Sequence, residues 1–299
     1  MSKAETSHHL TLPKGKDIPL LALGIFGIGT SGPIIAASKM PIPSLIFWRN
    51  LGGSLLLAPF ALRNKEWRSS QQRKAIQWSV FAGMLLGLHF LAFFAAMRYT
   101  TVATGTALTC LQPIFAALYV SFRGSKIPRK SWSGMAIAFL SVILITGIDF
   151  AIGTKYFLGD LAGIIGGALA AAYMLTGAHA QKAISTSTYA VVCYFFSAVT
   201  AFTAALIFGV QIWGFNTREW VLCFLLILGA QILGHTMFNL TLKRVSPVVV
   251  SLIVFFEVPV SAILAAIWLH QKPAGGIIPG LIGLLIGCAM FVVRSDASD

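Results

Sequence analysis

The sequence is built from long apolar runs that recur at short intervals between Ile18 and Val293. A bilayer core about 30 Å thick is crossed by a helix of about 20 apolar residues, and these runs have that length. Hydrophobic residues make up 57% of the chain and charged residues only 10%, which is too little polarity for a water-soluble fold. We therefore expect an all-α integral membrane protein.

We predict ten transmembrane helices, with boundaries good to a few residues. The ten spans are Ile18–Ala37, Ser44–Leu62, Ile76–Met97, Val102–Phe122, Trp132–Ile148, Leu158–Ala178, Thr188–Phe208, Trp220–Leu242, Pro247–Trp268 and Ile277–Val293. They divide the chain into a tail (1–17), a first five-helix repeat (18–149), a second five-helix repeat (158–293) and a short second tail (294–299).

The formal net charge of +13 does not indicate nucleic-acid binding, because the basic residues lie between the apolar runs. Lys and Arg in the loops of a membrane protein mark its cytoplasmic side. Most of them lie in the tails and in the even-to-odd connections. The other face carries Lys39, Arg49, Arg98, Lys155, Arg218 and Lys272. Both tails are thus predicted to be cytoplasmic, in a multi-pass protein of the bacterial inner (plasma) membrane.

A shift of 146 residues aligns the sequence with itself at polar and helix-breaking positions. It places His89 on His235, Arg98 on Arg244, Pro113 on Pro259, Lys126 on Lys272 and Gly134 on Gly280. The alternative is that apolar helices resemble one another by composition. Because each half has five spans, an odd number, the second repeat enters the membrane from the opposite side. Inverted repeats are typical of alternating-access carriers, which enclose a central cavity.

Two equivalent stretches of these repeats resemble a known family. Residues Ala95–Tyr119 read AAMRYTTVATGTALTCLQPIFAALY, and residues Leu240–Ala266 read LTLKRVSPVVVSLIVFFEVPVSAILAA. Together with Arg49 in FWRN, they are similar to the drug/metabolite transporter superfamily, specifically its EamA-type ten-helix exporters, over nearly the whole chain. The narrower resemblance is to the YddG-like amino-acid exporters. The chain departs from the family at Ser125 and Gln271, where a glutamate is common.

The resemblance implies a secondary transporter and not an enzyme. We expect export of small amphipathic metabolites, chiefly amino acids including aromatic ones, by alternating access through a midplane cavity. The alternative is a multidrug or other metabolite efflux carrier with proton antiport. The sequence has no Walker loop for ATP, and its spans contain no GxSxG, HExxH or paired aspartates of a membrane-embedded enzyme. A receptor would not require inverted repeats.

An acidic residue inside an apolar run is the sharpest candidate for the transport site. Glu257 lies halfway along its run, two residues before Pro259, and a charge at this depth costs about 2.5–3.5 kcal/mol on insertion scales. Glu257 either binds a substrate amine or a proton, or it is a protonated carboxyl group bonded between helices. The sequence leaves both interpretations open.

Four further polar residues lie within the runs. His89 and His235 occupy equivalent repeat positions, where a lone buried histidine is more often a core hydrogen-bond donor than a ligand. Gln112 precedes Pro113, and Asn239 lies one helical turn beyond His235 on the same face. These histidines and amides are predicted to line the cavity, where the amides would bind a carboxylate or an amine.

The first span contains GIFGIGTSGP, Gly24–Pro33. Small residues before a proline indicate either a broken helix or close packing through the glycines, and for the glycines we favour packing. The remaining predicted cavity residues are Thr30, Ser31, Trp48, Trp78 and Tyr99. For the aromatic ones the alternative is the belt that lies at the membrane interfaces.

The predicted cavity is lined by spans one, three, four, six, eight and nine. Pro33, Pro113 and Pro259 are predicted helix breaks or hinges. We predict no metal site and no cofactor, because the histidines have no second ligand at helical spacing. The four cysteines show no paired spacing. The expected partners are a small-molecule substrate, chiefly an amino acid, and the lipid bilayer, with no nucleic acid. Proton coupling and oligomeric state stay open, and a monomer is compatible with the sequence.

Overall fold

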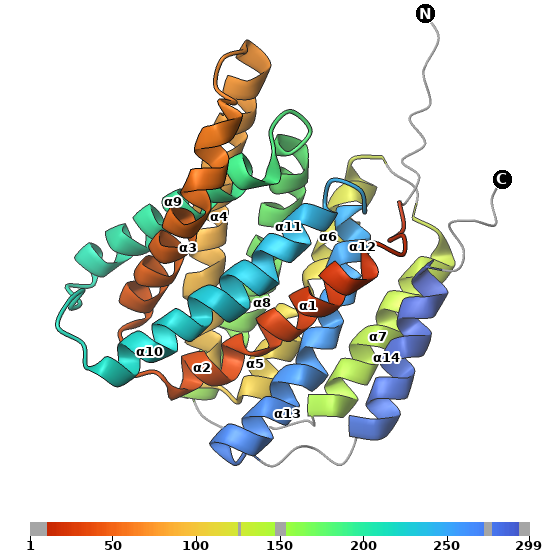
Figure 1. The fold of residues 1–299 in the computed structure, drawn as a ribbon. Helices are drawn as coiled ribbons and strands as arrows, with labels where there is room; N and C mark the ends of the chain where they lie inside the picture. Colours follow the sequence, from red (N-terminus) through yellow and green to blue (C-terminus); the bar gives the residue numbers. More distant parts are fainter. Residues whose placement is uncertain (1–10, 125–126, 147–153, 272–276, 293–299) are drawn as a thin grey trace, which may run out of the picture.

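The computed structural model describes residues 11–124, 127–146, 154–271 and 277–292, and these parts of the chain contain helices and no strand (Figure 1). The elements are α1 (Ile18–Gly29), α2 (Ser31–Ala37), α3 (Ile42–Asn64), α4 (Ser70–Tyr99), α5 (Val102–Thr109), α6 (Gln112–Phe122), α7 (Arg129–Thr146), α8 (Thr154–Ala180), α9 (Thr186–Ile207), α10 (Thr217–Leu226), the π-helix η1 (Ile227–Thr236), α11 (Met237–Thr241), α12 (Pro247–Ile253), the 3-10 turn η2 (Val254–Phe256), α13 (Glu257–Leu269) and α14 (Ile277–Val292).

Eight helical rods in the described residues are long and apolar enough to cross a bilayer. They correspond to the predicted spans one to four and six to nine, and their ends differ from the prediction by up to six residues. The fifth span is α7, which starts at the charged pair Arg129 and Lys130 and has 18 residues. The tenth is α14, with 16 described residues. Residues 147–148 and 293 of the predicted spans, and residues 1–10 and 294–299 of the predicted tails, lie outside the described ranges.

Three rods are interrupted near their middle, and each interruption precedes a proline. The breaks lie at Thr30 between α1 and α2, at Cys110–Leu111 between α5 and α6, and at η2 between α12 and α13. Pro33, Pro113 and Pro259 each lie in the first turn of the helix that follows. A proline is tolerated there because the first turn leaves backbone amides unbonded in any case.

The second repeat is inverted relative to the first. The turns 65–69, 181–185 and 242–246 lie on one face, which we call the starting face because α1 begins there. The turns 38–41, 100–101 and 208–216 lie on the opposite, far face. Helix α1 therefore enters the membrane from the starting face and α8 from the far face, as five spans per repeat require (Figure 1).

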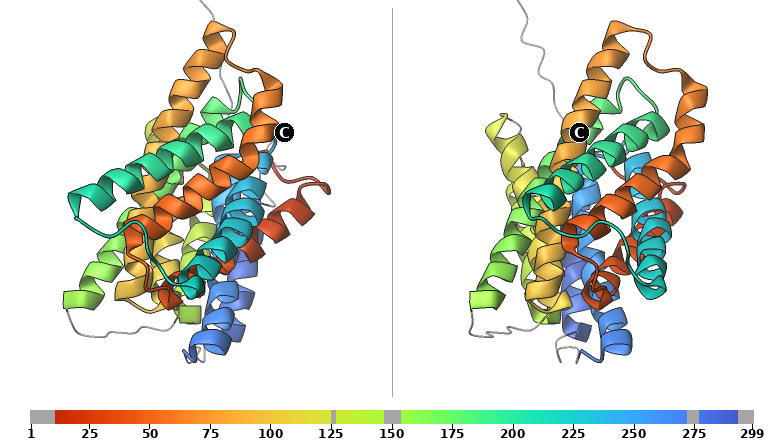
Figure 2. Two further views of the ribbon diagram at one scale, coloured as in Figure 1. Left: turned by 60° about the vertical axis from the view of Figure 1, so that its left-hand side comes forward. Right: turned by 90° about the vertical axis from the view of Figure 1, so that its left-hand side faces the viewer.

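The two repeats interlock around a pseudo-twofold axis. Helix α3 packs on its counterpart α9, α7 packs on its counterpart α14, and α5 contacts α13 while α6 contacts α12. Figure 1 shows the pair of α7 and α14 at the right-hand side of the remaining rods, and Figure 2 shows the same fold from two further directions. Each repeat thus supplies about half of the walls that meet in the centre.

Close packing through glycines, as predicted, is confirmed where helices cross. A Cβ on Gly27 of α1 would lie 2.6 Å from the backbone nitrogen of Gly234 in η1. In the other repeat, a Cβ on Gly167 of α8 would lie 2.7 Å from the carbonyl oxygen of Thr109. Both crossings bring backbones into direct contact, and this positions α1 and α8 against the central broken helices.

Candidate functional site

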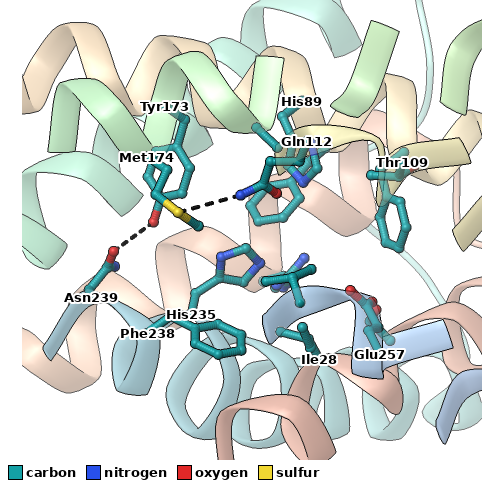
Figure 3. A pocket seen from close by; sticks show the side chains of 16 residues that line it. Ile28, His89, Thr109, Gln112, Tyr173, Met174, His235, Phe238, Asn239 and Glu257 are labelled. Carbon is teal, nitrogen blue, oxygen red and sulfur yellow. Dashed lines mark hydrogen bonds between the residues drawn. The ribbon is translucent and has the colours of Figure 1, made fainter. Parts of the chain in front are cut away.

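A cavity of about 50 Å³ lies where the rods of the two repeats converge. It is lined by Ile28, Ser31, Arg49, His89, Phe90, Phe93, Thr109, Gln112, Ala170, Tyr173, Met174, His235, Phe238, Asn239, Val254 and Glu257 (Figure 3). This volume suffices for a few water molecules. It is far below the roughly 300–1,000 Å³ of pockets that hold small molecules, so the conformation is occluded.

Two of the three interrupted rods, α5–α6 and α12–α13, meet at their breaks beside the cavity. The Gln112 amide nitrogen donates to the Ser251 hydroxyl at 2.9 Å, and Cys110 Sγ lies 3.7 Å from the Val254 carbonyl oxygen. Gln112 begins α6 and Glu257 begins α13. The interruption of each rod thereby presents one polar side chain from each repeat to the same space.

The His89 ring is held by one hydrogen bond and one stacking contact. Its Nδ1 lies 2.9 Å from the Gly166 carbonyl oxygen of α8, and the ring stacks on Phe93 with centroids 5.8 Å apart. Because a carbonyl oxygen only accepts, the neutral ring must carry its hydrogen on Nδ1, which leaves Nε2 as an acceptor. The predicted cavity position of His89 thus coincides with a structural bond between the repeats.

His235 lies on the π-helix η1, whose wider turns are common at functional sites. Its ring meets Phe90 edge-on at 5.1 Å and lies 6.3 Å from Tyr173. It makes no hydrogen bond with a described residue. Figure 3 shows this ring between Tyr173 and Glu257, in the middle of the cavity.

Asn239 belongs to a buried polar network at one end of the cavity. Its carbonyl oxygen accepts from the Tyr173 hydroxyl at 2.9 Å, and its amide donates to the Tyr194 hydroxyl at 3.4 Å. The Tyr194 hydroxyl also lies 3.0 Å from that of Thr236. These bonds fix the orientation of the amide and join α8, α9 and α11.

Arg49 is a cavity residue that sequence reasoning missed. It was counted among the basic residues of the far face, but α3 buries it to 1% exposure, and span two therefore joins the six predicted to form the walls. Its guanidinium carbon lies 4.1 Å from the centre of the Phe90 ring and 5.7 Å from that of Phe94. Its match to a family arginine was the only signal in the sequence that set it apart.

Glu257 is the carboxylate of this cavity and is 7% exposed. Within the described residues, the ion pairs join Arg218 to Glu219 and Arg244 to Asp17. Glu257 and Arg49 therefore line one cavity without forming an ion pair with each other. A buried unpaired charge costs on the order of several kcal/mol, so the Arg49 guanidinium retains a strong tendency to bind a partner.

Four of the predicted site residues lie outside the cavity wall in this conformation. Thr30 bonds back to the Gly27 carbonyl at 2.7 Å. Trp48 donates to the Ile212 carbonyl at 2.9 Å and lines a separate apolar hollow of about 380 Å³ between α3 and α10. Trp78 and Tyr99 are 45% and 41% exposed on α4. The predicted residues that the structure brings together are Glu257, His89, His235, Gln112, Asn239 and Ser31.

The far face is closed by a clasp between the repeats. The Glu219 carboxylate of α10 accepts from Ser38 Oγ at 2.6 Å and from the backbone amides of Lys39 and Met40 at 2.9 and 3.1 Å. From the other side, the Arg98 guanidinium donates to the Met40 carbonyl at 2.6 Å. The turn 38–41 is therefore held between α4 and α10.

The starting face is closed by a second clasp. Arg244 Nε donates to the Asp17 carboxylate at 2.7 Å, and Lys14 contributes a backbone amide at 3.0 Å. Burial alone would raise the pKa of Asp17, but these two donors hold it below the usual carboxyl value. Arg98 and Arg244 are equivalent in the repeat, so each repeat contributes one arginine to a clasp on one face.

Within the described ranges, no group of three or more His, Cys, Asp or Glu side chains could hold a metal ion. Cys110 at the break between α5 and α6, Cys193 in α9 and Cys223 in α10 are buried free thiols. Cys288 lies in α14, and its side chain is not among those described. The chemistry that the cavity offers is therefore charge, hydrogen bonding and aromatic contact.

Similarity to known proteins extends over nearly the whole chain. The family model of the EamA-like transporter family matches residues 15–147 and again residues 157–293, so each repeat matches it separately. One solved crystal structure of a protein superposes with a TM-score of 0.74 at 15% sequence identity, over 95% of this chain and 99% of that chain. At this identity the likeness concerns the fold alone. No curated protein matches the chain by sequence.

Proposed function

Because this chain belongs to the EamA-like transporter family, we propose that it is a secondary transporter that exports small amphipathic solutes, chiefly amino acids. The observation that carries the proposal is the occluded cavity between the inverted repeats, in which Glu257 faces aromatic rings. A carboxylate can bind an ammonium group, while Phe90, Phe93 and Phe238 offer contact to an apolar or aromatic side chain. Amino acids combine both features.

Alternating access is the mechanism that we infer from the two clasps. Opening the far-face clasp would free the turn 38–41 from Glu219 and Arg98, and opening the starting-face clasp would separate Asp17 from Arg244. With both clasps closed, as here, the cavity is too small for a solute. Transport then requires that one clasp opens while the other stays closed, so that the cavity never joins both sides.

Export also requires an orientation, which we propose from the distribution of charge. The turns on the starting face carry Lys65, Arg68, Lys182, Lys243 and Arg244, whereas the far-face turns 38–41, 100–101 and 208–216 carry only Lys39. Because positive loops remain in the cytoplasm, the starting face is assigned as cytoplasmic. Substrate would enter there and leave through the far face.

The direct test is flux from proteoliposomes that contain the purified chain. Radiolabelled phenylalanine, leucine and glycine are loaded, and release is followed with and without an excess of each unlabelled amino acid. We expect saturable release that is lost in Glu257→Gln, with Trp78→Phe on the exposed side of α4 as the matched control. Absence of saturable flux for every amino acid in a folded preparation contradicts the substrate assignment.

A multidrug carrier with proton antiport is the second candidate, since a lone carboxylate among aromatic rings also suits an organic cation or a proton. Arg49 argues against cations, because a cationic drug would place its charge in the same cavity as the guanidinium. Imposing a pH gradient in the liposomes separates the mechanisms. Proton antiport predicts accumulation against the substrate gradient, and uniport predicts none.

A further inference from the structure

The hydrogen-bond donors of Arg49 have no acceptor among the described residues. Its Nε, Nη1 and Nη2 atoms are buried and bond to no described residue, although the side chain is only 1% exposed and lines the cavity. A guanidinium carries five N–H donors in a rigid planar fork and remains charged in proteins. Buried groups of this kind are otherwise almost always paired, so we expect this arginine to bind an acceptor that the chain itself does not provide.

The contacts that Arg49 does make stabilise its charge without using its donors. The faces of Phe90 and Phe94, at 4.1 and 5.7 Å, attract a cation through their ring electrons. The faces of these rings do not accept hydrogen bonds from the N–H groups in the guanidinium plane. These N–H groups are therefore available to a ligand in the cavity.

The charged neighbours of Arg49 narrow the chemistry of that ligand. Glu257 is the carboxylate in the cavity lining, and the two side chains do not form an ion pair. The histidines of the lining, His89 and His235, are neutral acceptors or weak donors by comparison. Of the other acids near the described rods, Asp17 and Glu219 are engaged in the clasps at the two faces. Glu66 accepts from Ser185, and Asp160 of α8 is not part of the cavity lining. The Arg49 guanidinium, whose donors bond to no described residue, thus shares a small space with one carboxyl group, that of Glu257.

We propose that Arg49 binds the carboxylate of the transported solute, so that substrates are amphipathic monocarboxylates whose ammonium group is bound by Glu257. This inference rests on the proposed function and adds the chemical class of the substrate and its orientation. Arginine matches a carboxylate with two parallel hydrogen bonds. It matches phosphate equally well, but a phosphate dianion would bring two negative charges into the cavity that holds Glu257.

The test compares each acid with its own amide on the same protein. Phenylalanine, phenylalaninamide, 3-phenylpropionate and inorganic phosphate are titrated calorimetrically against the purified full-length chain. The wild type should bind phenylalanine at least about 100-fold more tightly than phenylalaninamide, because the amide removes the charge that Arg49 pairs with. In Arg49→Gln this ratio should fall to about 3-fold or less, and Arg49→Lys should give an intermediate value.

If Arg49 only stabilised the walls of the cavity, the binding data would differ. Arg49→Gln would then lower the affinity for the acid and for the amide by the same factor and leave the ratio of the two affinities unchanged. Phe94→Leu is the matched control, since it removes a ring beside the guanidinium and keeps the charge. It should preserve the acid-to-amide ratio. An unchanged ratio in Arg49→Gln overturns the inference, and so does a wild type that binds the amide as tightly as the acid, even if no variant folds.

The remaining probes separate this inference from the proposed function. Arg49-dependent binding of 3-phenylpropionate together with no flux of any amino acid would support the carboxylate site and contradict amino-acid export. Amino-acid flux with no acid-to-amide preference would do the reverse. Arg49-dependent binding of phosphate that is tighter than binding of either carboxylate would overturn the assigned substrate class.

Discussion

The two repeats place the same residue types at equivalent positions and use them differently. His89 lies on the regular helix α4 and bonds the Gly166 carbonyl, whereas His235 lies on the π-helix η1 and makes only ring contacts with described residues. Gln112, at the start of α6, bonds Ser251, whereas Glu257, at the start of α13, lines the cavity without an ion-pair partner. In the first repeat His89 and Gln112 are therefore engaged in hydrogen bonds within the protein, whereas we expect His235 and Glu257 of the second repeat to be available to a solute.

Arg49 reverses this pattern, and its asymmetry has a functional consequence. The residue 146 positions later is Phe195, so the second repeat has no basic counterpart. A cavity with exact twofold symmetry would hold equal charges at equivalent points. With Arg49 from one repeat and Glu257 from the other, a zwitterion can bind in one orientation only.

The largest expected effect comes from replacing Glu257, the acidic residue that has no acidic counterpart in the first repeat. Glu257→Gln should lower the kcat/KM of amino-acid flux by about 100-fold, or about 2.7 kcal/mol, because the shape is kept and the ammonium partner is lost. Liposome flux measures it. The same chain should remain folded by thermal unfolding, and a flux equal to that of the wild type would remove Glu257 from the site.

Replacing the two histidines should separate stability from transport. His89→Ala removes the side-chain donor to the Gly166 carbonyl and should lower the free energy of unfolding by about 1–3 kcal/mol. His235→Ala breaks no hydrogen bond with a described residue and should instead change KM. Unfolding in detergent and flux are measured on both variants. Equal stability losses at the two positions would contradict the division between the repeats.

The amide at the first break should contribute less. Gln112→Ala removes the bond to Ser251 and should destabilise the chain by about 1 kcal/mol, with less than about a threefold change in flux. Ser251→Ala is the matched control on the other helix, and the double variant should lose little more than either single one. A loss of flux comparable to that of Glu257→Gln would mean that Gln112 binds the solute.

The smallest effect should come from the starting-face clasp, because Arg244 is partly solvent-exposed. The pKa of Asp17 is depressed in the folded chain, so its contribution is present above the ordinary carboxyl pKa and is lost as pH falls through the depressed value. The starting face should therefore open more often in acid. Asp17→Asn should increase the fraction of molecules with an open starting face by up to about fivefold at neutral pH, and it should abolish this pH dependence. The rate at which a thiol reagent labels Lys16→Cys measures the opening.

Much of this fold follows from the sequence, because apolar runs, prolines and an odd number of spans per repeat constrain it directly. The predicted span Val102–Phe122 coincides with α5 and α6, and Pro113 follows the break between them. The π-winding of η1 was not foreseeable, since no residue pattern distinguishes it from an ordinary helix. It is the feature that sets His235 apart from His89.

The site was predictable only in part. Glu257 and His235 were found because polar groups are scarce within apolar runs. Arg49 was misplaced because a basic residue near the end of a span is ordinarily at the interface, and only packing shows that Phe90 and Phe94 enclose it. Trp48 and Trp78 were proposed as alternatives to an aromatic belt, and neither lines the cavity in this conformation.

We expect the two faces to open in alternation around this cavity. Double electron–electron resonance between spin labels at Lys39 and Thr217 reports the far face, and labels at Lys16 and Lys243 report the starting face; all four positions are exposed. On adding substrate, we predict that one distance lengthens in the same molecules in which the other stays short or shortens. Two faces that lengthen together, or that never change while solute crosses, would contradict it.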